Sequence, residues 1–293
     1  HATECPFCAT PVVVDTGSTR KLKPQALVPF QLTEAQARDR LSGWLGSLWF
    51  APNRLLEFTR KGRAMAGIYV PYWTFDADSA SRYSGQRGDY YYTTEWVTVQ
   101  VNGRTERRQE QVRHTRWTGV SGRVARSFDD VLIMASTSIP PDLGNALSNW
   151  QLSALTPYSP DYLAGFQAEG YTVALSDGHD RARDWMGRVI AEDVRRDIGG
   201  DEQRIDGIDS AFRDETFKHI LLPIWMAAYK YGGRSYQFLV NGQTGEVRGE
   251  RPYSVWKIAF AVLFALIVVG AVIYLNDPSA FGGAIGTLSD WQN

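Results

Sequence analysis

The sequence lacks the motifs that commonly mark an enzyme. It contains no GxxxxGK[S/T] phosphate-binding loop, no Rossmann glycine fingerprint after a strand, no GxSxG and no HExxH. It also lacks an excess of charge of either sign: 31 Lys and Arg oppose 32 Asp and Glu, which argues against a dedicated nucleic-acid binder. We therefore expect no catalytic residues and a non-enzymatic role.

Cysteine is scarce, with Cys5 and Cys8 alone, in the sequence CPFC. Two thiolates at this spacing suit one edge of a tetrahedral structural zinc site, which needs two further ligands. We interpret residues 1–15 as half of a zinc ribbon whose other ligands lie upstream, and zinc is the one cofactor expected. A redox pair and a remnant without metal remain alternatives.

Charge and proline are absent from one long apolar stretch near the end of the chain. From Ile258 to Leu275 there is no charge, amide or proline, and a helix of that length covers roughly 27 Å, close to the ~30 Å of a bilayer core. The stretch predicts a single transmembrane helix over 255–276, with Trp256 and Tyr274 at the interfaces and Lys257 snorkelling.

The charges that flank this stretch predict its orientation. Arg248, Arg251 and Lys257 precede or begin it, whereas the tail 277–293 has no Lys or Arg. The excess of positive charge predicts a large cytoplasmic N-terminal domain and a short tail outside.

The remaining chain reads as helices followed by antiparallel strands. A capping box at Thr33 predicts a helix start, and a second long helix is expected from Ser176 through Ile198. Asn102-Gly103 between two strand-like stretches predicts a hairpin with a type I′ turn. Blocks of strands follow each helix.

Two segments resemble each other, IYVPYW at 68–73 and ILLPIW at 220–225. Each follows a long helix and precedes a hairpin, which predicts an α+β protein of two helix-plus-meander units, a pseudo-repeat over 16–150 and 151–254. The proline in each segment predicts an edge strand or a strand start.

Arginines interleave with aromatic residues along the predicted hairpin, and the candidates for an anionic surface are Arg107, Arg113, Arg116, Arg123 and Trp117. Such a surface could bind nucleic acid or anionic lipid. Alternatively it is a solvated face balanced by Glu95, Glu106 and Glu110.

Paired carboxylates occur at Asp76 and Asp78 and at Asp129 and Asp130. Strand alternation would place Asp129 and Asp130 on opposite faces. Asp76 and Asp78 can share a face, and we expect them to be solvated.

Several motifs together resemble a family of bacterial zinc-ribbon, single-pass membrane proteins, often named automatically "primosomal protein N′ (replication factor Y), superfamily II helicase". The resemblance rests on long matches that cover nearly the whole chain: CPFC, KPQALVPF, WFAP, GIYVPYWTFDA, TRWTGVSG, FKHILLPIWMAAYKYGGRSYQFLVNGQTGEVRGERP and the apolar stretch after them. It implies a zinc ribbon, an α+β domain and a C-terminal membrane helix in the bacterial plasma (inner) membrane. This chain departs from the pattern in lacking the first CxxC, and no residues support the helicase name.

The expected function is a membrane-anchored adaptor or scaffold that recruits a protein partner at the bilayer. The resemblance implies that a flotillin-like SPFH-domain protein is a possible partner. The alternative is a membrane-tethered nucleic-acid-binding module that uses the basic aromatic hairpin.

Overall fold

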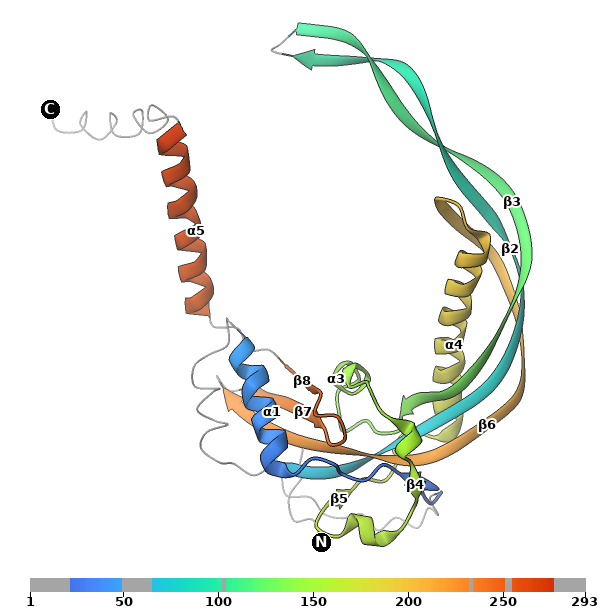
Figure 1. Cartoon of the computed structure of the whole chain (residues 1–293), viewed down its shortest axis with the longest axis vertical. Coiled ribbons are helices and arrows are strands. Elements are labelled where there is room, and N and C mark those ends of the chain that lie inside the picture. The colour runs from blue at the N-terminus through green and yellow to red at the C-terminus, as the bar shows by residue number, and fades with distance from the viewer. Residues whose placement is uncertain (1–21, 49–64, 102–103, 232–233, 251–254, 277–293) are drawn as a thin grey trace, which may run out of the picture.

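The computed structural model describes residues 22–48, 65–101, 104–231, 234–250 and 255–276. Its strands form one eight-stranded sheet of order β3-β2-β6-β1-β4, with β5 beside β2, and with β7 and β8 beyond β6 (Figure 1). The strands are β1 (Ala26–Leu27), β2 (Ala66–Val101), β3 (Arg104–Met134), β4 (Thr156–Pro157), β5 (Gln167–Ala168), β6 (Glu202–Tyr231), β7 (Arg234–Asn241) and β8 (Val247–Gly249). The helices are α1 (Glu34–Ser47), α3 (Pro141–Ala146), η1 (Leu152–Ala154), η2 (Pro160–Leu163), α4 (Leu175–Ile198) and α5 (Val255–Asn276).

Helix α1 begins as its sequence predicts. The Thr33 hydroxyl accepts a hydrogen bond from the Gln36 N–H at 3.4 Å, and the Gln36 side chain accepts one from the Thr33 N–H at 2.9 Å. This capping box satisfies two backbone donors that the first turn of a helix leaves unpaired.

Helix α4 carries a buried stripe at every fourth position, formed by Ala182, Met186, Ile190 and Val194. A stripe at this spacing packs one side of a helix against a sheet. The helix ends at Gly199, whose φ of 64° lies in the left-handed region that glycine adopts without strain.

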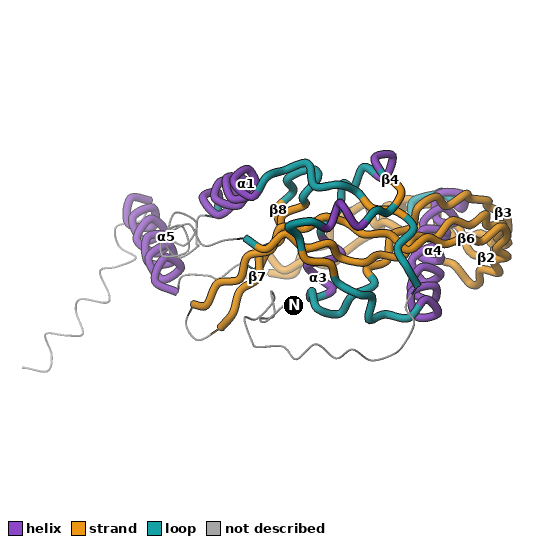
Figure 2. The backbone as a smooth tube through the Cα atoms, turned by 90° about the horizontal axis from the view of Figure 1, so that it is seen from below, coloured by secondary structure: helices purple, strands orange, loops and turns teal. Residues whose placement is uncertain are grey.

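Helices α1 and α4 pack on the same face of the sheet. They lie at opposite ends of it (Figure 2). Helix α4 covers Trp73 and Phe75 of β2, and α1 covers Trp225 of β6. Because side chains alternate along a strand, Tyr72 points to the other face. There it joins a second core that is covered by the segment around α3 and η1.

The two similar segments lie side by side in the centre of this sheet. Residues 68–72 of β2 pair antiparallel with 220–224 of β6, and Val70 faces Leu222, its own equivalent in the repeat. A short parallel strand pairs with the first two residues of each segment. Strand β5 pairs with Ile68 and Tyr69, and β1 pairs with residues 220–221, the equivalent positions of the second segment. The prediction of two separate α+β units is therefore wrong, because the related halves share one sheet around a local two-fold relation.

Pro71 and Pro223 lie within central strands of this sheet, contrary to the edge strand or strand start predicted for each. The Pro71 carbonyl accepts the Ala135 N–H at 2.9 Å, and the Pro223 carbonyl accepts the Gly242 N–H at 2.8 Å. In an antiparallel strand the N–H and C=O of one residue point to the same side. The missing donor of each proline therefore points away from the partner strand in the β2–β6 pair, at the level where β3 and β7 have just ended, and the central β2–β6 ladder is intact.

The prediction of a single-pass membrane protein is contradicted. Among the described residues, no helix combines the length and the apolar character needed to cross a bilayer. The predicted plasma-membrane localisation, and the orientation inferred from the flanking charges, depend on that membrane span and are contradicted with it. The side chains of Trp256, Lys257 and Tyr274, and the segments 1–15 and 277–293, lie outside the described set.

His219 predicts a pH dependence of stability. It is 4% exposed, its Nδ1 donates to the Leu22 carbonyl at 3.0 Å, and its ring lies 4.9 Å from that of Trp73. Burial lowers the pKa of His219, outweighing the hydrogen bond to Leu22, which raises it. Below the ordinary histidine pKa of about 6.5 the unfolded chain binds a proton that the folded chain resists, so stability is lost as pH falls.

We expect the free energy of unfolding, measured in urea at pH 7 and pH 5, to be smaller at pH 5, and His219→Gln to reduce that difference. The control His114→Gln, in an exposed part of β3, should leave the difference in place. An unchanged pH dependence in His219→Gln would contradict the assignment.

Candidate functional site

Strands β2 and β3 extend beyond the rest of the sheet as a two-stranded ribbon, residues 89–101 and 104–116. Strand β6 begins at Glu202, opposite Gly88, so beyond that point each ribbon strand pairs only with the other. Figure 1 shows the ribbon curving away from the body of the protein. An isolated two-stranded hairpin is marginally stable in water, because neither face is covered. The side chains of the ribbon are therefore positioned to meet another molecule.

The register of the ribbon assigns its side chains to two faces. Pairing runs without a shift from Tyr90–Thr115 to Val101–Arg104. Residues directly opposite each other share a face, and successive residues alternate. One face, here called the aromatic face, carries no carboxylate in this register; its aromatic and charged members are Tyr90, Tyr92, Trp96, Arg107 and Arg113.

The aromatic face is open to solvent. Tyr92 and Trp96 are each 61% exposed. The Arg113 guanidinium lies 4.3 Å from the centre of the Tyr90 ring, within the range of a cation–π contact. The Tyr90 hydroxyl donates to Glu202 at 2.8 Å, which fixes the base of this face to the start of β6.

The opposite face of the ribbon carries charged groups that pair with one another. His114 Nε2 lies 3.0 Å from Glu95 and 2.8 Å from the Thr93 hydroxyl, and Arg108 lies 3.7 Å from Glu110. The hydrogen bonds from Thr93 and His114 lower the pKa of Glu95. The predicted balance between the arginines and these glutamates therefore holds for this face and not for the aromatic one.

The structure divides the five predicted anionic-surface residues. Arg107 and Arg113 share the aromatic face, whereas Arg116 lies on the opposite face, 5.2 Å from the Tyr91 ring. Trp117 lies at the base of the ribbon, where the Arg204 guanidinium is 3.9 Å from its ring centre, and Arg123 is farther along β3. The five do not form one surface. The predicted zinc ligands Cys5 and Cys8 lie outside the described residues, so the zinc site stays a prediction.

Asp76, Asp129 and Asp130 come together where the sheet is irregular. The register of β2 against β3 shifts between Phe75 and Ala77, which sets Asp129 and Asp130 opposite Asp76. Such a bulge overrides the alternation that predicted opposite faces. One carboxylate oxygen from each residue can approach the others within 4.8 Å.

Lys218 provides the positive charge for this cluster. Its ammonium lies 3.1 Å from Asp130 and 3.3 Å from Asp76. Partial burial raises the pKa of Asp76, but hydrogen bonds from the Asp130 N–H and Thr216, together with Lys218, lower it overall. Asp76 and Asp130 are thus paired with a cation of the same chain, and we assign the cluster a structural role.

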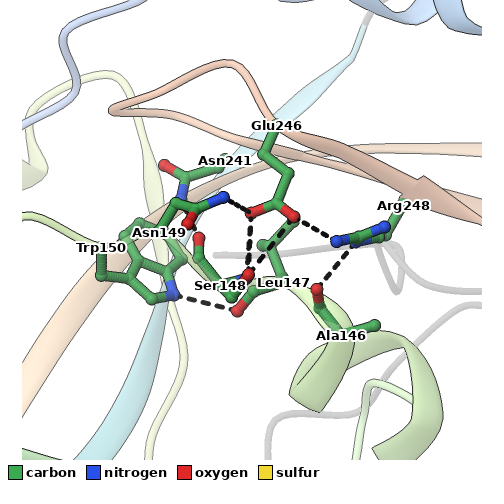
Figure 3. Close-up of polar contacts among 8 residues, drawn as sticks. All are labelled: Ala146, Leu147, Ser148, Asn149, Trp150, Asn241, Glu246 and Arg248. Carbon is green, nitrogen blue, oxygen red and sulfur yellow. Dashed lines mark hydrogen bonds and ion pairs between the residues drawn. The ribbon is translucent and has the colours of Figure 1, made fainter.

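A second polar cluster fixes the segment after α3 to the β7–β8 turn (Figure 3). The Glu246 carboxylate accepts the Ser148 N–H at 3.0 Å and the Asn149 side chain at 3.4 Å, and it pairs with Arg248. Arg248 also donates to the Ala146 carbonyl at 2.7 Å. These donors surround both carboxylate oxygens, so the cluster is a clamp between two segments.

The sequence analysis missed a surface on α4. Helical spacing in the sequence would place Trp185 with the apolar residues that face the sheet, yet it is 42% exposed, and Arg181 and Arg188 flank it one turn away on either side. The stripe at every fourth residue, 182, 186, 190 and 194, already fills the contact with the sheet. That spacing is the signal that would have placed Trp185 beside the contact and not within it.

Comparison with known proteins identifies one curated relative. The chain is 23% identical over 266 residues to "Uncharacterized protein YdjG" of Bacillus subtilis (strain 168), a match that covers 89% of this chain and 73% of that protein. No family model matches the sequence. No solved structure matches it.

Proposed function

We propose that this protein is a non-enzymatic adaptor that recruits a protein partner through the aromatic face of its ribbon. The observation that carries the proposal is the exposure of Tyr92 and Trp96 beside Arg107 and Arg113, on a ribbon face without carboxylates. Trp, Tyr and Arg are the residues that contribute most of the binding energy in protein interfaces.

The continuous backbone pairing of the ribbon supports this function. Continuous pairing holds the side chains of the aromatic face in one register, and Tyr90 is fixed between Arg113 and Glu202. A pre-ordered surface loses less conformational entropy on binding than a flexible one. The resemblance of the sequence suggests a flotillin-like SPFH-domain protein as the partner to look for first.

Nucleic-acid binding is the second candidate, because exposed aromatic rings beside arginines can stack on bases and contact phosphates. Two arginines, Arg107 and Arg113, share the aromatic face with these rings. This candidate predicts an affinity that falls steeply with salt and that is weakened by Arg113→Ala. Arg116→Ala should have little effect, because Arg116 lies on the other face.

The test is gentle extraction of the full-length tagged chain from its own cells, with mass spectrometry of the proteins that co-purify. We expect a stoichiometric protein partner whose recovery falls at least tenfold with Tyr92→Ala/Trp96→Ala. The matched control is Thr93→Ala/Glu95→Ala, which alters the opposite face of the same ribbon and should retain the partner. Equal recovery with both double variants, or nucleic acid in place of a protein, would contradict the proposal.

A further inference from the structure

The aromatic face of the ribbon continues onto the body of the sheet. The pairing of β2 with β3 runs without a shift over residues 77–101 and 104–128, so even-numbered residues of β2 share one face with odd-numbered residues of β3 along this whole length. On the body of the sheet, Val120 and Val124 pack against the core beneath α4, whereas Arg123 is exposed. The aromatic face therefore leads onto the face of the sheet opposite α4, which lies on the inner side of the curve in Figure 1.

We call this continuous surface the strip and define it as the even-numbered residues 82–100 of β2 and the odd-numbered residues 105–123 of β3. Its charged residues are all arginines: Arg82, Arg107, Arg113 and Arg123. The acidic residues Asp89, Glu95 and Glu110 of the same strands lie on the opposite face. The strip is therefore positively charged, and neither of its own strands supplies a carboxylate to balance it.

The four arginines of the strip are exposed, and none of the ion pairs found among the described residues involves any of them. Arg82 and Arg123 lie directly opposite each other across the two strands, an arrangement in which like charges destabilise a sheet. The neighbouring strand β6 carries the carboxylates that border the strip, Glu202, Asp206 and Asp209, and Asp209 is opposite Arg82. Neither Arg113 nor Arg123 has a carboxylate directly opposite, so both are open to an external anion.

Aromatic rings connect the two ends of the strip. Trp117 follows Tyr90 along the strip, and the Arg204 guanidinium of β6 lies 3.9 Å from its ring centre. Aromatic and arginine side chains thus succeed one another from Trp96 on the ribbon to Arg123 on the sheet. Trp, Tyr and Arg contribute most of the binding energy in protein interfaces, so the composition that marks the aromatic face persists beyond the ribbon.

We infer that the partner protein binds the strip through an acidic surface, which reaches from the ribbon onto the sheet as far as Arg82 and Arg123. This inference rests on the proposed function and specifies the chemistry of the partner. Carboxylates of the partner pair with Arg113 and Arg123 and relieve the repulsion between Arg123 and Arg82. Charge complementarity of this kind selects the partner and speeds its association. The net charge of the chain, −1, suits the carboxylates of a protein better than the phosphates of a nucleic acid.

The probe is a labelled ten-residue peptide in which glutamate alternates with serine, titrated into the whole chain by fluorescence polarisation at low salt. The control peptide carries glutamine in place of glutamate. We expect saturable binding of the glutamate peptide, at least tenfold tighter than that of the glutamine peptide, because the strip offers arginines without acidic partners. Absence of saturable binding, or equal affinity for the two peptides, would overturn the inference.

Two double variants locate the binding of the peptide. Arg113→Glu/Arg123→Glu should weaken it at least tenfold, because both arginines belong to the strip. Arg108→Glu/Arg116→Glu changes the net charge by the same amount on the opposite face of the same strands, and it should bind the peptide as the unmodified chain does. An equal loss of affinity in the two variants would show a response to net charge alone and would contradict the strip as the site.

Recovery of the partner from cells separates this inference from the adaptor proposal. We expect Arg123→Glu to lower recovery at least tenfold and the matched variant Arg116→Glu to retain the partner, with melting temperatures by circular dichroism showing that both chains are folded. A partner that is lost with Tyr92→Ala/Trp96→Ala but kept with Arg123→Glu would overturn the acidic surface and leave the adaptor proposal standing. Nucleic acid in place of a protein, or no partner with the unmodified chain, would overturn both.

Discussion

Replacing Trp73 with alanine should lower the free energy of unfolding by about 3–5 kcal/mol, the usual cost of removing a fully buried tryptophan. Trp73 is 0% exposed, and its Nε1 donates to the Val173 carbonyl at 3.0 Å just before α4 begins. A Cβ at Gly178 in the first turns of α4 would lie 2.7 Å from the Trp73 ring, so the helix is seated directly on this side chain. The Trp73→Ala variant therefore leaves a cavity under α4, and at the same place the Val173 carbonyl loses the hydrogen bond from Trp73.

Equilibrium unfolding in urea measures this effect, with Trp185→Ala as the matched control. Trp185 belongs to the same helix–sheet region but is 42% exposed, so its loss should cost less than about 1 kcal/mol. Similar destabilisation by the two variants would show that Trp73 does not anchor α4.

Shortening the ribbon should abolish partner binding and leave the core intact. Because Tyr92 and Arg113 are directly opposite, residues 93–112 can be replaced by Asn-Gly, which provides the positive φ angles of a two-residue hairpin turn. The shortened chain keeps every residue of the cores that pack under α1 and α4. We expect at least a hundredfold loss of partner recovery, because Trp96 and Arg107 are removed together.

The melting temperature, followed by circular dichroism, is the control for the shortened chain. A change of no more than about 2 °C would show that the ribbon contributes to binding and not to folding. Full recovery of the partner by the shortened chain would place the binding surface elsewhere.

Local signals in the sequence predicted the parts of the fold that depend on near neighbours. The start of α1 at the Thr33 capping box depends on a few neighbouring residues, and so does the end of α4 at the glycine after Ile198. The structure confirms both. The hairpin around Asn102-Gly103 is confirmed as the pairing of β2 with β3. The second helix begins slightly earlier than predicted, with Ala174 and not Ser176 as its N-cap.

Long-range pairing decided the features that sequence patterns did not show. Segments 68–73 and 220–225 read as members of separate units, because nothing local indicates that they pair with each other. The bulge that brings Asp129 and Asp130 to Asp76 is a register shift between distant strands, and alternation along one strand cannot predict it.

Only part of the candidate site could be predicted, because the rest of it also depends on pairing between residues that are distant in the sequence. Arg107 and Arg113 were identified, but their separation from Arg116 depends on which residues lie directly opposite across the hairpin. The continuation of the aromatic face to Arg82 was missed because it follows from the unshifted register between β2 and β3.

Site-specific photocrosslinking tests the adaptor proposal most directly. A benzophenone amino acid is placed at position 96, on the aromatic face, or at position 95, on the opposite face, in the full-length chain in its own cells. We expect a crosslink from position 96 to one protein of discrete mass, and none to that protein from position 95. Equal crosslinking from both positions, or crosslinks from position 96 to nucleic acid or lipid alone, would contradict it.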